Sequence, residues 1–243
     1  VVLTKEQILV EKEEQILIRY TLEEAKSPTI LRFKPFLAFR NIHTLSKANM
    51  FANSKYKPAK NGVSIKMYDK FPDLFMQFNK NAEFIPAPDW YYNIEYLKEL
   101  NRGYDYLEDL LVPGYFEVPI KKGETIIFAA GTSETKPISL KQRFTKEIKK
   151  RGTHITFTSS LNNAAAQFIM HKNGDTDIVA GFPWYSSITR QTFISLPGIY
   201  SAQNNLRDFK NILDTYVKHL ENGFFPDNIH SKNKQFNSAD TSL

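Results

Sequence analysis

The chain of 243 residues contains no cysteine. Without thiols it can form neither a disulfide nor a zinc site with thiolate ligands, which suits a reducing cytoplasm. Its five histidines are scattered, and none has the HxH or HExxH spacing of paired imidazole ligands. We therefore expect a cytoplasmic protein without a metal site, and we exclude thiol and metalloprotease chemistry.

Long apolar runs and nucleotide-binding motifs are also absent. No apolar run approaches the roughly 18 residues that a membrane span needs, and the first ten residues do not have the pattern of a signal peptide. The sequence lacks GxxxxGK, GxGxxG and GxSxG. We expect no membrane partner and no cofactor, which leaves carboxylate chemistry or binding alone.

The positive charge is concentrated in one short segment. Of the formal net charge of +6, nearly all comes from residues 137–151, which hold six basic side chains and one acidic side chain. Nucleic-acid surfaces usually spread their basic residues and interleave aromatic ones. The segment is better interpreted as the solvated face of a helix, and we expect no nucleic-acid partner.

The first half of the sequence has the period of β-strands. Residues 16–22 alternate apolar and polar side chains, as a half-buried strand requires. The alternation of residues 31–39 is interrupted at Pro35. Further strands are predicted at residues 63–68, 74–78, 115–120 and 125–130. Many short strands with turns between them predict a β-sandwich.

An aromatic stretch at residues 89–106 interrupts this pattern. Its tyrosines and Trp90 suit the stacking of sugars, and they suit packing between parts of the protein equally well.

The remaining sequence has a helical period. Ser139 and Gln142 form a capping-box pattern at the start of a helix, and a second helix is expected from about residue 159 to residue 173. The clearest helix covers residues 205–222, whose apolar side chains share one face. We thus predict an α+β protein with three parts: a sandwich at 1–136, a basic linker helix at 137–152 and a helical part at 153–243.

Carboxylate chemistry needs two acids that face each other. Seven acids follow the basic segment: Asp175, Asp177, Asp208, Asp214, Glu221, Asp227 and Asp240. Asp175 and Asp177 have the pattern of turn residues, and their spacing only weakly suggests calcium. Asp240 stands out, because polar groups that can orient a ligand precede it in the sequence NSAD.

The densest group of functional residue types lies between residues 181 and 198. Trp184 and Tyr185 offer flat aromatic faces, while Arg190 and Gln191 offer planar hydrogen-bonding groups. Carbohydrate recognition uses this combination, but a buried tryptophan beside a helix start is also a common core feature. The residues alone leave both interpretations open.

The sequence resembles the bacterial and archaeal glycogen-debranching (amylo-α-1,6-glucosidase) family. The matching segments are AGFPWY (180–185), RQTFISLPG (190–198), GFFPD (223–227) and FNSAD (236–240), with further likeness upstream in VEKEEQILIRYTLEE and DWYYNIEY.

The resemblance implies a β-sandwich followed by an (α/α)₆ barrel that holds the glucan. It also implies that this chain is partial, with an incomplete sandwich and only the first helical hairpins of the barrel. The catalytic acid and base are then expected beyond Leu243, so that the chain alone is inactive. The implied substrate is an α-glucan cleaved at α-1,6 branch points, and the implied substrate-binding residues are Trp184, Tyr185, Arg190, Gln191 and Asp240.

One departure from the family pattern matters. The family reads Arg-Asp-Thr where this chain reads Arg190-Gln191-Thr192, and that aspartate is thought to grip the sugar in the cleavage subsite. A neutral amide loses the charge-assisted hydrogen bond. This favours, as the alternative hypothesis, a glucan-binding or interaction protein that keeps the fold without the chemistry.

Overall fold

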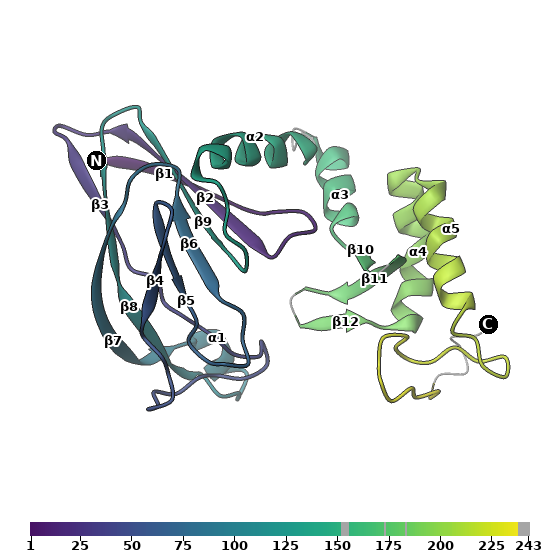
Figure 1. Cartoon of the computed structure of the whole chain (residues 1–243). Helices are drawn as coiled ribbons and strands as arrows, with labels where there is room; N and C mark the ends of the chain where they lie inside the picture. Colours follow the sequence, from purple (N-terminus) through teal and green to yellow (C-terminus); the bar gives the residue numbers. More distant parts are fainter. Residues whose placement is uncertain (152–155, 173, 183, 238–243) are drawn as a thin grey trace. The chain divides into compact units, whose positions relative to one another are not determined.

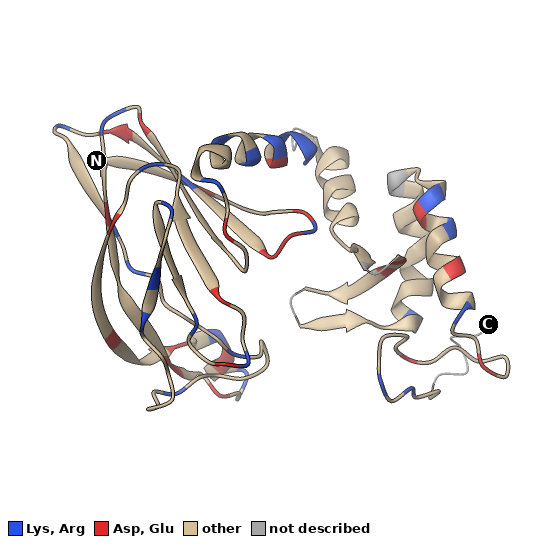
Figure 2. Cartoon of the chain, viewed as in Figure 1, with Lys and Arg blue, Asp and Glu red and all other residues tan. Residues whose placement is uncertain are grey.

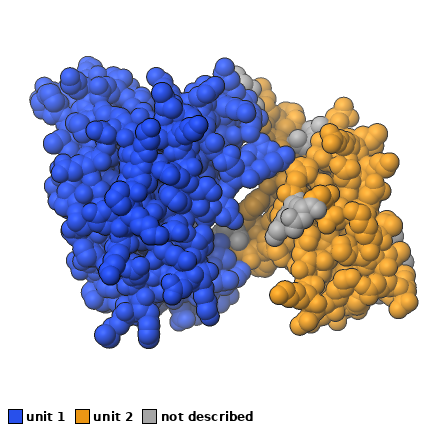
Figure 3. All heavy atoms as spheres, viewed as in Figure 1, with its two compact units in different colours: residues 1–150 blue, residues 151–243 orange. Residues whose placement is uncertain are grey.

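The computed structural model describes residues 1–151, 156–172, 174–182 and 184–237. The chain divides into two compact units, residues 1–150 and residues 151–243 (Figure 3). Each unit has hydrophobic clusters of its own and is described by itself.

The first unit contains two antiparallel sheets (Figure 1). The larger sheet has the order β1-β2-β9-β6-β5-β4, and the smaller has the order β3-β8-β7. The strands of the larger sheet are β1 (Val2–Leu9), β2 (Gln15–Glu24), β9 (Thr125–Gly131), β6 (Leu74–Phe78), β5 (Gly62–Ile65) and β4 (Tyr56–Ala59). Those of the smaller sheet are β3 (Thr29–Phe33), β8 (Leu107–Ile120) and β7 (Glu83–Glu95).

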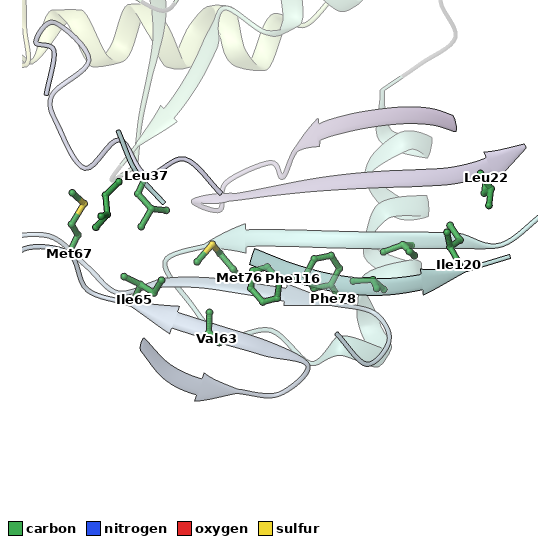
Figure 4. Packing of buried hydrophobic residues seen from close by; sticks show 12 residues of the cluster. Leu22, Leu37, Val63, Ile65, Met67, Met76, Phe78, Phe116 and Ile120 are labelled. Atoms are coloured by element: carbon green, nitrogen blue, oxygen red, sulfur yellow. The ribbon is translucent and has the colours of Figure 1, made fainter. Parts of the chain in front are cut away.

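The main core lies between the two sheets (Figure 4). Phe78 on β6 and Phe116 on β8 are fully buried, and their ring centroids are 5.1 Å apart. Alternate side chains of each strand point to one face of a sheet, so the two inner faces meet in a single apolar layer. This arrangement confirms the predicted sandwich.

The aromatic stretch belongs to this sandwich. It forms the end of β7 and the short helix α1 (Leu97–Asn101), and it stops just before β8. Only the last residues of β8, 115–120, were predicted as a strand. Trp90 packs against the main core, while Tyr92 and Tyr104 are exposed. The stretch therefore serves packing at one position and meets solvent at others.

A buried carboxylate on β8 fixes the neighbouring loops. Glu108 is 0% exposed and accepts hydrogen bonds from Arg40 (2.5 and 3.0 Å), Tyr96 (2.6 Å) and Ser46 (2.9 and 3.0 Å). Burial would raise the pKa of Glu108, but these donors outweigh it and lower the pKa to about 2. The carboxylate thereby ties residues 40–46 and 96 to the sandwich.

The basic helix belongs to the first unit. After a 3₁₀ turn, η1 (Pro137–Ser139), helix α2 runs over Leu140–Lys150. Leu140 and Phe144 are buried in a second cluster with residues of β1, β2 and β9, so α2 covers the outer face of the larger sheet. The domain boundary that the sequence analysis expected near residue 136 thus falls inside the first unit.

Electrostatic contacts hold α2 in place. Arg143 pairs with Glu13 and donates to Gln15 (3.0 Å), and Lys150 lies 3.2 Å from Glu11. The remaining lysines give α2 the basic surface seen in Figure 2. The capping box expected at Ser139 does not form, because its hydroxyl donates to the carbonyl of Lys136 (2.7 Å).

The second unit is not all-helical, contrary to the prediction. Helix α3 (Phe157–Ala166) is followed by three antiparallel strands, β10 (Ile169–Lys172), β11 (Asp175–Gly181) and β12 (Tyr185–Ser187). The helix expected to reach residue 173 therefore ends seven residues earlier, and the chain continues as a strand. Thr156 caps α3 by accepting a hydrogen bond from the amide of Ser159 (3.1 Å).

Two further helices pack on β11. They are α4 (Thr189–Gln203) and α5 (Leu206–Val217), which form one helical hairpin around Asn204 in the left-handed conformation. The core of this unit contains Ile178, Leu196 and Tyr216, one from each of β11, α4 and α5. Helix α5 begins where predicted, with Asn205 as its N-cap, and it ends five residues before residue 222.

Candidate functional site

The aromatic pair expected to bind sugar lies at the surface of the second unit. Strand β12 pairs with β11 through Val179↔Ser187 and Gly181↔Tyr185. Tyr185 is 62% exposed and Trp184, just before the strand, is 43% exposed. Their exposure shows that neither ring is buried in the core of the unit.

Buried threonines set the direction of the first turn of α4. Thr189 is fully buried, where its hydroxyl donates to the carbonyl of Pro226 (2.5 Å) and its amide donates to the carbonyl of Asp227 (2.9 Å). Thr192 is fully buried one turn later. Because residues three apart share one face of a helix, Arg190 and Gln191 between them are exposed.

The loop after α5 joins this surface. Asn228 donates to the hydroxyl of Ser186 (3.1 Å), and the ring centroids of Phe193 and Phe225 are 5.1 Å apart. The structure thus brings residues 223–228 beside β12 and α4, although more than thirty positions separate the contacting residues in the sequence.

A second contact fastens the next segment. The carboxylate of Asp227 accepts hydrogen bonds from the backbone amide (3.2 Å) and the side-chain amide (2.9 Å) of Asn237. Asp227, which the sequence placed only in a loop, therefore orders residues 227–237. Asp240, expected to bind substrate, lies outside the described residues.

Beneath this surface lies a buried polar cluster centred on Asp177, whose side chain is 1% exposed. Its Oδ1 accepts from the amide of Ile178 (2.6 Å) and from the hydroxyl of Tyr216 (2.7 Å). Its Oδ2 lies 3.0 Å from Nε2 of His230. The sequence suggested a turn residue, but Asp177 instead occupies the middle of β11 and is buried.

Tyr216 links Asp177 to the site. Its hydroxyl lies 3.0 Å from the hydroxyls of both Ser187 on β12 and Thr192 on α4. Burial, reinforced by the negative charge of Asp177, raises the pKa of Tyr216 above its ordinary value. The phenol therefore stays protonated and donates to the carboxylate. The only sequence signal for this cluster was the unexplained DxD spacing.

Most other acids of this unit form local contacts. Asp175 pairs with Lys218 (3.1 Å), Asp208 accepts from Asn205 (2.7 Å) at the start of α5, and Glu221 pairs with Lys234. Asp214 is exposed on α5.

Within the described ranges, no three histidine and acidic side chains come together as a group that could hold a metal ion. No helix of this part of the chain is long and apolar enough to cross a membrane.

Two known protein families match separate parts of the chain. The family described as "glycogen debranching enzyme N terminal" matches residues 1–127, and the family described as "amylo-alpha-1,6-glucosidase" matches residues 163–243. The chain therefore belongs to the glycogen debranching enzyme family. None of the curated proteins matches it.

Among solved structures, the chain is similar to a bacterial glucoamylase complexed with acarbose. The TM-score is 0.47 and the sequences are 13% identical. The match covers 93% of this chain and 39% of the glucoamylase chain, so the chain spans well under half of that protein.

Proposed function

We propose that this chain is part of a glycoside hydrolase that acts on α-1,6 branch points of glycogen-like α-glucans. One observation carries the proposal: hydrogen bonds and a ring contact bring the described residues of three family-like segments, 184–198, 223–227 and 236–237, to one surface. A packing role alone would not require these segments to frame exposed aromatic and polar side chains.

In this proposal, the exposed side chains bind the glucan. The faces of Trp184 and Tyr185 cover the C–H surface of a glucosyl ring, and the planar groups of Arg190 and Gln191 meet its hydroxyls. Asp240 contributes a further polar contact. The second unit is, on this view, the beginning of an (α/α)₆ barrel.

The hydrolytic step requires an acid and a base. Asp175, Asp177, Asp208, Asp227 and Glu221 are each held by the contacts described above, so we do not assign the catalytic pair to them. The chain contributes substrate binding, and the pair comes from other residues of the protein.

Binding is tested by titrating the chain with maltooligosaccharides, using calorimetry and the fluorescence of Trp184. We expect saturable binding that weakens about fivefold or more when Tyr185 is changed to alanine, because aromatic contacts are worth on the order of 1–3 kcal/mol per ring. Phe51→Ala, an exposed position in the first unit, serves as the control. Absence of binding by the unaltered chain would overturn the proposal.

Gln191 favours a second candidate function, a glucan-binding protein without hydrolysis. Glucose release from a branched dextrin distinguishes the two, measured for the full-length parent protein of this chain, unaltered and with Gln191→Asp. Release by either protein supports the hydrolase, and a higher rate with Gln191→Asp supports our interpretation of that position. Glucan binding without release by either protein would support the second candidate.

A further inference from the structure

His230 occupies the boundary between the buried cluster and solvent. Its imidazole contacts Asp177, which is 1% exposed, yet the imidazole itself is 33% exposed. One edge of the ring therefore lies against the buried carboxylate while another part reaches the surface. The sequence gave no reason to single out this residue among the five histidines.

The hydrogen bonds of Asp177 determine which ring nitrogen carries the proton. The carboxylate already accepts from the Ile178 amide and the Tyr216 hydroxyl, and a carboxylate can only accept. Nε2 of His230, 3.0 Å from Oδ2, must then be the donor. In the neutral ring this leaves Nδ1 as an acceptor, and Nδ1 has no hydrogen-bond partner among the described residues.

The position of His230 relates it to the glucan-binding surface. Its backbone amide donates to the side-chain oxygen of Asn228 (2.8 Å), and Asn228 in turn donates to the hydroxyl of Ser186, next to Tyr185. A short chain of hydrogen bonds thus connects the histidine to β12.

We infer that His230 is a further glucan-contacting residue, whose Nδ1 accepts a hydrogen bond from a sugar hydroxyl. Asp177 is the positioning residue that fixes the ring and its tautomer. This inference rests on the proposed function and adds a chemical element to it. Arg190 can only donate, so the imidazole adds an acceptor to the site besides the amide oxygen of Gln191 and the carboxylate of Asp240.

Two substitutions of His230 test separately the contact that Nε2 makes with Asp177 and the acceptor role of Nδ1. Glutamine can place an amide N–H near Nε2, which keeps the contact with Asp177 and removes the acceptor. Asparagine can place an amide oxygen near Nδ1, which keeps the acceptor and removes the contact. We expect His230→Gln to bind maltooligosaccharides about 3- to 10-fold more weakly, the value of one hydrogen bond, with unchanged thermal stability. His230→Asn is expected to lose less affinity and more stability.

The role of Asp177 is tested by NMR spectroscopy, which shows which nitrogen of the His230 ring carries the proton. In histidine labelled with ¹⁵N, we expect His230 to be the Nε2–H tautomer in the unaltered chain. Asp177→Asn can present an amide donor to Nε2, so we expect the tautomer to change to Nδ1–H and glucan affinity to fall by a similar 3- to 10-fold factor. His219→Gln, a partly exposed histidine after α5, is the matched control and should change neither property.

The outcomes separate this inference from the proposed function. If the unaltered chain binds glucan and His230→Gln binds it equally well, the inference is overturned and the proposed function stands. An Nδ1–H tautomer in the unaltered chain would also overturn it. Failure of the unaltered chain to bind any maltooligosaccharide would overturn both.

Discussion

A fully buried carboxylate lies in each unit, Glu108 in the first and Asp177 in the second. The partners of Glu108 include the guanidinium of Arg40, which carries a permanent charge. The partners of Asp177 are a backbone amide, a phenol, the hydroxyl of Thr192 (3.4 Å) and an imidazole. Each carboxylate has a partner that reaches solvent, and His230 does so further, at 33% exposed against 20% for Arg40.

The difference separates a structural ion pair from a positioning group. A buried carboxylate paired with arginine is electrically compensated, and removing either partner leaves a charge without compensation. Asp177 has no arginine or lysine partner within the described residues, so its contacts are individually weaker, and its exposed neighbour can meet a ligand. Each unit contains one of the two tryptophans, Trp90 and Trp184, so fluorescence can follow the two units separately.

The largest effect is expected for Glu108→Gln. The substitution leaves Arg40, 20% exposed, without its carboxylate, and we expect the free energy of unfolding of the first unit to fall by about 3 kcal/mol. This free energy is measured by urea unfolding in a Trp184→Phe background, where the fluorescence of Trp90 follows the unfolding of the first unit. Glu117→Gln, which breaks the more exposed pair with Arg32 (2.6 Å), should cost less than about 1 kcal/mol. Equal costs for the two variants would refute the structural role of Glu108.

The acid dependence of the first unit should follow from the same residue. The pKa of Glu108 is about 2 in the folded chain, against an ordinary value of 4.5. Its contribution to stability is therefore complete above the ordinary value and is lost as the pH falls toward the folded value. We expect the stability difference between the unaltered chain and Glu108→Gln to shrink as the pH falls from about 5 to about 2. A difference that stays constant over this range would contradict the assignment.

A smaller effect is expected in the second unit for Tyr216→Phe. The variant removes the hydroxyl that contacts Asp177, Ser187 and Thr192, and we expect a loss of about 1–3 kcal/mol. Trp184 reports this unfolding in a Trp90→Phe background.

Tyr200→Phe is the matched control for that variant. Tyr200 lies on α4 against the ring of Phe209, with centroids 5.0 Å apart, and its change should stay within about 0.5 kcal/mol. If Tyr216→Phe behaves like Tyr200→Phe, the cluster around Asp177 does not stabilise the unit.

The smallest effect is expected for Gln191→Asp. Gln191 is the third residue of α4, whose first turn contains no acidic side chain. An aspartate there interacts favourably with the helix dipole and should raise stability by about 0.3–1 kcal/mol. Ser201→Asp, in the last turn of the same helix, should have the opposite sign. Thermal unfolding of both variants checks this, and destabilisation by Gln191→Asp would show that the residue makes a contact the aspartate cannot replace.

Several elements were predictable because their signal is local. Strands β2, β6 and β9 face the sandwich core with alternating side chains, and α5 presents an apolar stripe. Strand β7 was missed because Pro86, Pro88 and consecutive aromatics obscure its alternation. Proline is tolerated there because β7 is an edge strand of its sheet.

The second unit shows where local signals fail. Strand β11 begins Asp-Thr-Asp, a sequence with the composition of a turn. Asp177 becomes an interior residue only because Tyr216, 39 positions later, donates to it. Such a partner cannot be found from the neighbours of Asp177 in the sequence, since it depends on how α5 packs against β11.

The sequence by itself determined the sandwich, the last helix, the family and the residue types of the glucan-binding surface, because these depend on short-range period and on motifs. Only the tertiary structure decided that α2 packs on the sandwich, that Trp184 and Tyr185 are exposed, and that Asp177 and His230 meet beneath them. Those properties arise from contacts between distant segments, whose free energy is gained only when the chain has folded.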